Sequence, residues 1–238
     1  MPLPLSIDAW LNRLLPRVCL LCGDRATGAL CAECEADLPR LAGPLCPVCA
    51  QPLEAPAPAC GACLKQPPAF DACFTPLQYA PPADALVRLF KFPGEPFARR
   101  LASADCLAAA MLGGPRPAGD VIVPVPLSRA RLKERGFNQA LELARPLARA
   151  LMLPLDTTGL VRVRETAPQS TLAWEERARN LRQAFLAERS YAGLSVILVD
   201  DVMTTGATFD AAASALKAAG AVRVFGWSAT RALKAGPP

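Results

Sequence analysis

Residues 196–208 read VILVDDVMTTGAT, in which an apolar run leads into two acids and a threonine-rich loop. The β-branched residues 195–199 predict a strand that is buried on both faces. Residues 206–219 predict a helix, which Gly220 ends. A buried strand that passes through a short loop into a helix is part of a βαβ unit, so this stretch favours an α/β fold with a parallel sheet.

The loop between this strand and this helix carries the groups that a ribose 5-phosphate needs. Backbone N–H groups at the start of a helix, Gly206 and three threonine hydroxyls form a cradle for a phosphate monoester. The threonines are Thr204, Thr205 and Thr208. Asp200 and Asp201 would repel a phosphate and are better suited to accept hydrogen bonds from ribose hydroxyls. The alternative is that the threonines only cap the helix and the acids lie on a loop. Neither glycine-rich nucleotide motif, G-x-x-x-x-G-K-[ST] or G-x-G-x-x-G, occurs in the chain.

Further strands and helices are expected before and after this stretch. Strands are expected at residues 121–125, where Pro124 marks the end, and at residues 222–227. Helices are expected at residues 5–15, 83–92, 96–112 and 138–151. This alternation implies a parallel sheet whose ligands bind beyond the carboxyl ends of the strands. No internal repeat is evident.

The first part of the chain contains eight of its ten cysteines, in four C-x-x-C pairs. The pairs are Cys19/Cys22, Cys31/Cys34, Cys46/Cys49 and Cys60/Cys63. Each has the size of a zinc knuckle, and two knuckles supply the four thiolates of a closed, structural zinc site. We expect the first two pairs on one zinc and the last two on another, although the spacing also permits a cross-braced arrangement. A disulfide framework is the alternative, which a reducing compartment disfavours.

Composition excludes several functions. The 238 residues include no His, which rules out Ser-His and Cys-His hydrolases. Residues 1–75 hold five Lys or Arg against seven Asp or Glu, and residues 76–238 hold twenty-one against fourteen. The basic excess of the second part suits a phosphate-bearing ligand or nucleic acid, and suits a solvated surface about as well. No apolar run approaches the ~20 residues of a membrane span, and no signal peptide is evident, so membrane insertion is not expected and the expected location is cytoplasmic.

Three features near the loop allow two interpretations each. Lys91 ends an apolar helix, and an exposed position is favoured over a phosphate contact. Asn138 is either the N-cap of the following helix or a ligand residue. A cluster of four cations is either a solvated face or a nucleic-acid contact, and its members are Arg129, Arg131, Lys133 and Arg135.

Long motifs in a fixed order identify a family. Residues 196–208 resemble the phosphoribosyl pyrophosphate (PRPP) motif of type I phosphoribosyltransferases. Together with the C-x-x-C pairs, three further segments resemble the ComF family, which comprises competence protein F and its GntX-like relatives. These segments are residues 123–144 (VPVPLSRARLKERGFNQALELA), 162–172 (RVRETAPQSTL) and 176–185 (ERARNLRQAF). The resemblance implies an N-terminal helix at residues 1–18, a double zinc-ribbon-like module at 19–75 and a phosphoribosyltransferase-like domain at 76–238.

The resemblance also implies a set of site residues. Asp200 and Asp201 would hold the ribose hydroxyls, and the loop that follows would bind the 5-phosphate. That loop comprises Val202, Met203, Thr204, Thr205, Gly206, Ala207 and Thr208. Arg129 would approach the pyrophosphate, and residues 162–169 would form a flexible lid with Arg164 as its cation, so that a reaction would rest on Asp200, Asp201 and Arg164. Mg²⁺ would accompany PRPP, held mostly by phosphate oxygens and water. Ser128 stands where relatives commonly carry His.

Three functions follow from this resemblance. In the first, the chain acts in DNA uptake, handling single-stranded DNA beside uptake-machinery proteins and using a PRPP-like pocket. In the second, it is a phosphoribosyltransferase that moves the ribose 5-phosphate of PRPP to a base or an amine. In the third, it senses PRPP and its zinc module signals to a partner. The resemblance over nearly the whole chain favours the first.

Overall fold

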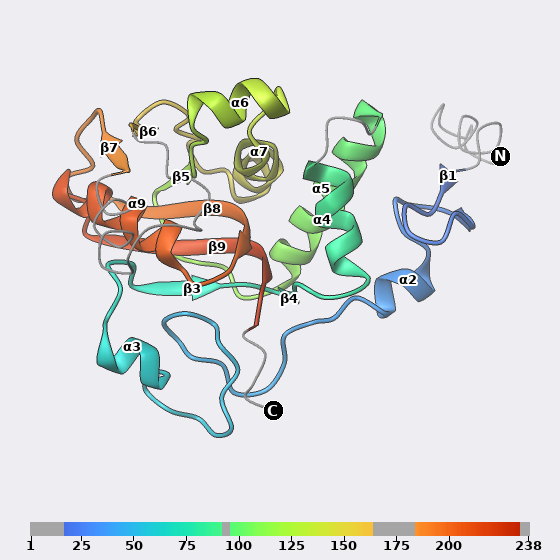
Figure 1. The fold of residues 1–238 in the computed structure, drawn as a ribbon, viewed down its shortest axis with the longest axis horizontal. Helices are drawn as coiled ribbons and strands as arrows, with labels where there is room; N and C mark the ends of the chain where they lie inside the picture. Colours follow the sequence, from blue (N-terminus) through green and yellow to red (C-terminus); the bar gives the residue numbers. More distant parts are fainter. Residues whose placement is uncertain (1–16, 92–95, 164–183, 234–238) are drawn as a thin grey trace, which may run out of the picture.

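The computed structural model describes residues 17–91, 96–163 and 184–233. Its centre is a five-stranded sheet in the order β3-β9-β8-β5, in which β4 also pairs with β9 (Figure 1). The strands are β3 (Ala72–Phe74), β4 (Leu77–Gln78), β5 (Val121–Pro124), β8 (Ser195–Met203) and β9 (Arg223–Arg231). Every pairing in this sheet is parallel, which confirms the predicted parallel α/β sheet.

Helices cover both faces of the sheet. One face carries α4 (Ala83–Lys91), α5 (Phe97–Gly113) and α7 (Gln139–Leu151), and the other carries α9 (Ala207–Ala218). Alternation along β5 accounts for the two layers, because Val121 and Val123 lie in the core with α9 while Ile122 lies in the core with the other helices. All four residues of β5 are buried, as expected for a strand that is covered on both sides.

Seven short elements complete the described fold. In the cysteine-rich part these are β1 (Arg17–Val18), β2 (Arg25–Ala26), α2 (Ala32–Ala36) and α3 (Gly61–Lys65). Later in the chain they are α6 (Arg129–Arg135) and the antiparallel pair β6 (Leu160–Arg162) and β7 (Phe185–Ala187). Every helix within these described ranges is too short or too polar to cross a membrane.

Two strands run further than the apolar pattern predicts. The sequence places their ends at Val199 and Trp227, whereas β8 continues to Met203 and β9 to Arg231. The ladder continues through polar partners, since Asp200 pairs with Ser228. The apolar pattern therefore ends before the hydrogen bonding does, and Asp200 and Asp201 belong to a strand rather than to a loop.

The sheet also begins earlier in the chain than residue 76. β3 lies within the segment assigned to the zinc module, yet it pairs with β9 along Ala72–Phe74. β4 continues the same edge, with Leu77 opposite Thr230. The predicted module at residues 19–75 therefore contributes an edge strand to the sheet. The predicted N-terminal helix at residues 1–18 falls almost wholly on residues outside the described ranges.

Candidate functional site

A cavity of about 340 Å³ lies at the carboxyl ends of β5 and β8. Residues Asp200, Asp201 and Val202 of β8 line it, together with Thr204 and Thr208 from the following loop and α9. Four cations from other parts of the chain also line it, namely Lys91, Arg131, Arg135 and Arg162. The position is the one expected for a ligand of a parallel sheet. The cavity thus brings paired acids, threonine hydroxyls and cationic side chains into one space.

The two acids differ in their surroundings. Asp201 is buried, and its Oδ2 lies 3.1 Å from Lys91 Nζ. Asp200 accepts a hydrogen bond on Oδ1 from the Asp201 amide at 2.9 Å. Burial, followed by the neighbouring Asp201 carboxylate, raises the pKa of Asp200 to about 7. Near neutral pH Asp200 is therefore partly protonated, and in its protonated form it can donate as well as accept a hydrogen bond.

Lys91 was expected on the surface, and the structure places it otherwise. It is the last residue of α4, after the buried Leu86, Val87 and Phe90. Its side chain is 26% exposed and pairs with Asp201 across the cavity. The amphipathic pattern of α4 does not reveal this, because the acid partner is 110 positions further along the sequence.

The loop from β8 into α9, residues 203–208, combines residues that face the cavity with residues that face the core, and we call it the phosphate loop after its expected role. Thr204 and Thr208 line the cavity, whereas Thr205, Gly206 and Ala207 are not among its lining residues. Thr205 Oγ1 accepts a hydrogen bond from the Ala207 amide at 3.3 Å. Met203 is buried in the core, where its Sδ accepts from Cys73 Sγ at 3.1 Å. The loop therefore offers the Thr204 and Thr208 hydroxyls to a ligand in the cavity.

Gly206 sets the entry into α9. Its φ is +84°, and it occupies the N-cap position of the helix. A Cβ at this residue would lie 2.8 Å from Met203 Cε. The backbone conformation therefore favours glycine, and a side chain here would also have to displace the Met203 methyl group.

Helix α6 presents a different arginine from the one expected. Arg129 is exposed and does not line the cavity, while Arg131 and Arg135 do. Arg131 and Arg135 are four residues apart, so they lie on the same face of α6, and this face is the one toward the cavity. Ser128, where relatives commonly carry His, is the N-cap of α6 and accepts a hydrogen bond from the Arg131 amide. The sequence did not predict which of the four cations face the cavity, because it was equally compatible with a loop and with a short helix at this position.

Asn138 and Gln139 begin α7 beside the cavity. Asn138 is the N-cap, with Oδ1 accepting from the Ala140 amide at 3.0 Å and Nδ2 donating to the Val125 carbonyl at 3.1 Å. The capping interpretation is confirmed, and Asn138 lines the cavity as well. Gln139 is only 2% exposed, and its Nε2 has no hydrogen-bond partner within the described residues. A buried amide without a partner costs ~1–3 kcal/mol, so Gln139 is a donor that sequence reasoning missed.

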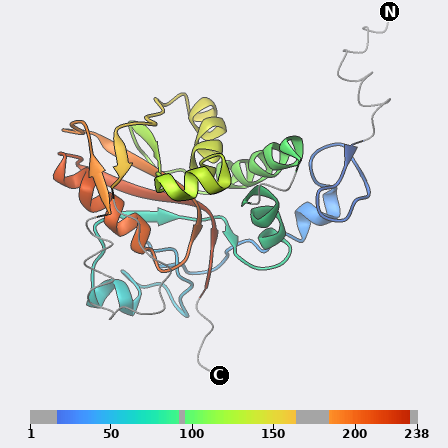
Figure 2. The same cartoon turned by 45° about the horizontal axis from the view of Figure 1, so that its top comes forward.

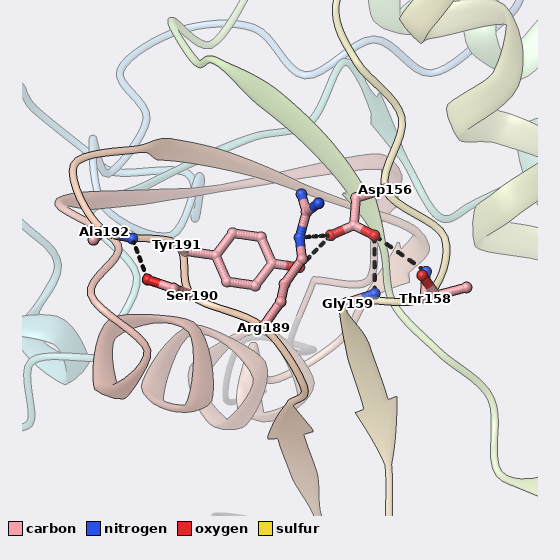
Figure 3. A network of polar contacts seen from close by, with 7 residues as sticks. All are labelled: Asp156, Thr158, Gly159, Arg189, Ser190, Tyr191 and Ala192. Atoms are coloured by element: carbon pink, nitrogen blue, oxygen red, sulfur yellow. Dashed lines mark hydrogen bonds and ion pairs between the residues drawn. The ribbon is translucent and has the colours of Figure 1, made fainter.

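Arg162, the last residue of β6, lines the cavity. The chain that leads into β6 is held by a network of polar contacts around Asp156 (Figure 3). The Asp156 carboxylate accepts from the Tyr191 hydroxyl at 2.5 Å and from the Gly159 amide at 2.9 Å. Arg189 Nε lies 2.8 Å from the same carboxylate. Burial alone would raise the pKa of Asp156, but these donors and the Arg189 charge outweigh it and hold the pKa below its usual value. Arg164 and the rest of the expected lid up to residue 169 lie outside the described residues.

The eight paired cysteines form two clusters. The first cluster is Cys19, Cys22, Cys31 and Cys34, and the second cluster is Cys46, Cys49, Cys60 and Cys63. Within each, the sulfurs lie within 4.8 Å of one another, so the sequential pairing is confirmed. The separations Cys22 Sγ–Cys31 Sγ and Cys49 Sγ–Cys60 Sγ are 3.7 and 3.6 Å. Zn–S bonds of ~2.3 Å in a tetrahedron place sulfurs ~3.8 Å apart, and a disulfide needs ~2.05 Å. Both clusters therefore fit a structural zinc ion.

The clusters repeat one local structure, although no repeat was evident in the sequence. Cys19 and Cys46 each donate from the amide to a carbonyl five residues later, at 2.7 and 2.8 Å. The helices α2 and α3 then begin directly after Cys31 and Cys60. Cysteine spacing that differs by two residues between the copies obscures the repeat.

Comparisons with known proteins agree with this architecture. A double zinc ribbon domain matches residues 10–64, and a phosphoribosyl transferase domain matches residues 138–225. DNA utilization protein YhgH of Salmonella typhi is 37% identical over 92% of this chain and 99% of its own length. Competence protein F of Haemophilus influenzae is 32% identical over 87% of this chain and 92% of its own length.

Other similarities cover less of the chain. Competence protein ComFC of Bacillus subtilis is 41% identical over 40% of this chain and 38% of its own length. Among solved structures, glutamine PRPP amidotransferase from B. subtilis matches 60% of this chain and 30% of its own, at 18% identity and a TM-score of 0.41. The near full-length similarity to YhgH and competence protein F, with both domains in order, shows that the chain belongs to the ComF family.

Proposed function

We propose that the chain binds PRPP or a related ribose 5-phosphate in this cavity and acts through it in the uptake and use of DNA. One observation carries the proposal: Asp200 and Asp201 share a single cavity with Thr204, Thr208 and four cations. The carboxylates can accept hydrogen bonds from the ribose hydroxyls, and the start of α9 can bind the phosphate. These two features match the two ends of a ribose 5-phosphate.

Each group has a role in this arrangement. Thr204, Thr208 and the amides at the start of α9 bind the 5-phosphate. Asp200 and Asp201 accept from the ribose hydroxyls, with Lys91 balancing the charge of Asp201. Arg131 and Arg135 of α6 take the pyrophosphate, which carries Mg²⁺ held mostly by its own oxygens and water.

The role in DNA uptake is supported by the relatives, which are named for DNA utilization and competence. A DNA strand is a poor ligand for the cavity itself, because deoxyribose has no 2′-hydroxyl and its 3′-oxygen is esterified within the strand. The acid pair would have no hydroxyl to accept from. Single-stranded DNA would instead meet exposed cations such as Arg129 and Lys133 on the outer face of α6.

Transfer of the ribose phosphate is a second candidate, favoured by the unpartnered donor of Gln139 in the cavity wall. In such a reaction the bond from C1 to the pyrophosphate oxygen breaks and pyrophosphate leaves with the electron pair. The acceptor nitrogen forms the new bond to C1 and loses a proton. Gln139 would position the acceptor or the leaving group.

Calorimetric titration with Mg²⁺-PRPP and with ribose 5-phosphate tests the proposal. We expect saturable binding by the wild type and at least tenfold weaker binding by Asp200→Asn/Asp201→Asn, because two acceptors of the ribose are weakened. Asp105→Asn, on the exposed surface of α5, is the matched control and should bind like the wild type. Absence of binding by the wild type, or equal binding by the double variant, would contradict the site.

The role in DNA uptake needs a separate test. We expect a transformable host that lacks this protein to lose transformation, and the wild-type gene, but not the double variant, to restore it. Unchanged transformation frequency in the deletion strain would refute the role while leaving the binding site standing.

A further inference from the structure

Arg231, the last residue of β9, connects the second cluster to the phosphate loop. It is 5% exposed, and its Nε donates to the Cys49 carbonyl at 3.1 Å. Its Nη1 donates to the Met203 carbonyl at 3.1 Å and to the Thr204 carbonyl. Within the described residues its charge faces carbonyl groups and the Gln51 side chain rather than a carboxylate. One buried guanidinium thus joins a zinc knuckle to the loop that begins the candidate phosphate site.

The geometry of the peptide bond shows what these contacts control. In a trans peptide the C=O and the next N–H point in opposite directions and lie in one plane. The Met203 carbonyl shares its plane with the Thr204 amide, and the Thr204 carbonyl shares its plane with the Thr205 amide. Arg231 holds the Thr204 carbonyl, and it shares the Met203 carbonyl with the Ala232 amide, which donates to it at 2.9 Å. Both following amides are therefore directed away from Arg231. Arg231 thus orients the Thr205 amide and helps the β8–β9 ladder to orient the Thr204 amide.

The chain that follows the second cluster supports the loop from the same side. Phe70 packs edge-on against Phe209 of α9, with ring centroids 6.3 Å apart. The Ala69 amide donates to Asp210 Oδ1 at 2.6 Å, and Cys73 Sγ donates to Met203 Sδ. Three cysteines of the second cluster are buried in the same core as Phe70, Met203 and Phe209. The second cluster is thus continuous with the packing under the loop.

The first cluster has no such connection among the described residues. Its neighbours Leu20, Leu21 and Leu30 pack against the other core, which is formed with α4, α5 and α7. Figures 1 and 2 both place α2 of the first cluster beyond α4 and α5, while α3 of the second cluster lies below β3. The two cysteine clusters therefore share a local structure, but only the second is connected to the phosphate loop. Each can serve as a control for the other.

We propose that Arg231 is a positioning residue through which the metal-loaded second cluster holds the phosphate loop ready for a ribose phosphate. Loss of metal would free the knuckle at Cys49, release Arg231 and let the Thr204 carbonyl turn together with the Thr205 amide. The inference rests on the proposed function for its ligand, but the orientation of the loop can be measured without one. Linkage requires the reverse effect as well, so a bound ribose phosphate must strengthen metal retention at the second cluster.

Matched cysteine variants separate the two clusters. Cys60→Ser and Cys31→Ser change equivalent positions, each directly before a short helix. We expect Cys60→Ser to weaken ribose 5-phosphate binding at least fivefold in calorimetry, within the usual range of coupling between sites. Cys31→Ser should stay within twofold of the wild type. Equal effects of the two variants would overturn the proposal.

Hydrogen exchange tests the loop without ligand. Arg231→Lys keeps the charge but loses the planar fork that reaches several carbonyls, and Arg231→Gln loses the charge as well. We expect faster exchange of the Thr205 amide in Cys60→Ser and in both Arg231 variants, but not in Cys31→Ser. Unchanged exchange in Cys60→Ser would refute the connection even if ribose 5-phosphate bound normally.

If the Arg231 variants fail to fold, the rate of zinc release from the wild type tests the proposal instead. We expect ribose 5-phosphate to slow transfer of one zinc equivalent to a chromogenic chelator at least fivefold and to leave the other unchanged. Equal rates with and without a ligand that calorimetry shows to be bound would overturn the proposal. If the wild type binds no ribose 5-phosphate, the proposed function fails, and hydrogen exchange alone decides the role of Arg231.

Discussion

Asp200 and Asp201 are adjacent in β8 but meet different partners. Lys91 pairs with Asp201, whereas Asp200 is half-buried beside the Asp201 carboxylate and accepts a hydrogen bond from the Asp201 amide. The consequence is a carboxyl group that holds its proton close to neutral pH. Such a group lets the site adjust its charge when an anionic ligand arrives.

The pKa of Asp200 predicts a pH dependence of stability. Its folded pKa of about 7 lies above the ordinary value of 3.8, so the folded chain holds a proton that the unfolded chain releases. The stability from this group is fully present below about pH 4 and is lost as the pH rises through about 7. Asp200→Asn cannot ionise, so its free energy of unfolding should rise relative to the wild type between pH 5 and pH 8, by at most ~3 kcal/mol.

Urea unfolding at the two pH values measures this difference. Asp105→Asn, at an exposed position on α5, controls for a general effect of removing one acid. A difference between Asp200→Asn and the wild type that is the same at both pH values would show that Asp200 titrates normally.

At the scale of elements, the junction between β8 and α9 determines the phosphate loop. β8 carries the acids to the edge of the sheet, and Gly206 turns the chain into α9 at a φ of +84°. A Cβ there would have to displace the Met203 methyl group. The path of the chain from β8 into α9 therefore depends on Gly206.

Gly206→Ala tests this junction. We expect a loss of ~2–3 kcal/mol of stability, from the left-handed backbone and the contact with Met203, together with weaker binding of ribose 5-phosphate. Gly193→Ala is the matched control, since Gly193 has a φ of +76° with no atom within 4 Å of an added Cβ. It should cost ~1 kcal/mol by chemical denaturation and leave binding unchanged. Equal losses in the two variants would mean that the space at Gly206 is not limiting.

At the scale of the whole molecule, the cysteine-rich part and the sheet are interdependent. β3 pairs with β9, Phe70 and Cys73 are buried in the core, and Arg231 requires the Cys49 carbonyl. The first cluster contributes only partly buried leucines to the opposite core. The two halves of the cysteine-rich part should therefore differ in how far the rest of the fold depends on them.

Two truncations test this asymmetry. A chain of residues 37–238 lacks the first cluster and should still unfold cooperatively, with a lowered Tm. A chain of residues 76–238 lacks β3 and the second cluster, and leaves Arg231 without its Cys49 partner. We expect it to be insoluble or to show no cooperative transition in calorimetry, because β9 loses its edge partner β3 and the buried Arg231 guanidinium loses its Cys49 acceptor, which alone costs ~1–3 kcal/mol. Similar Tm values for the two truncations would show that the sheet does not need the second cluster.

The sequence by itself determined the features that depend on local pattern. Buried parallel strands carry continuous apolar runs, zinc knuckles need two cysteines at fixed spacing, and a phosphate loop needs its acids, threonines and glycine in order. Each of these signals lies within a few residues, so the parallel sheet, the four cysteine pairs and residues 200–208 could be identified without coordinates. The ends of β8 and β9 could not, because hydrogen bonding continues after the apolar pattern stops.

The tertiary structure alone decided which distant residues complete the site. Lys91 meets Asp201, α6 turns Arg131 and Arg135 rather than Arg129 to the cavity, and Gln139 is buried in its wall. Arg231 contacts Cys49 across 182 positions of the sequence. Charges and amides of this kind carry no periodic signal, and their partners are set by how the strands and helices pack. For this reason the sequence predicts the chemistry of the loop, and only the fold reveals what surrounds it and supports it.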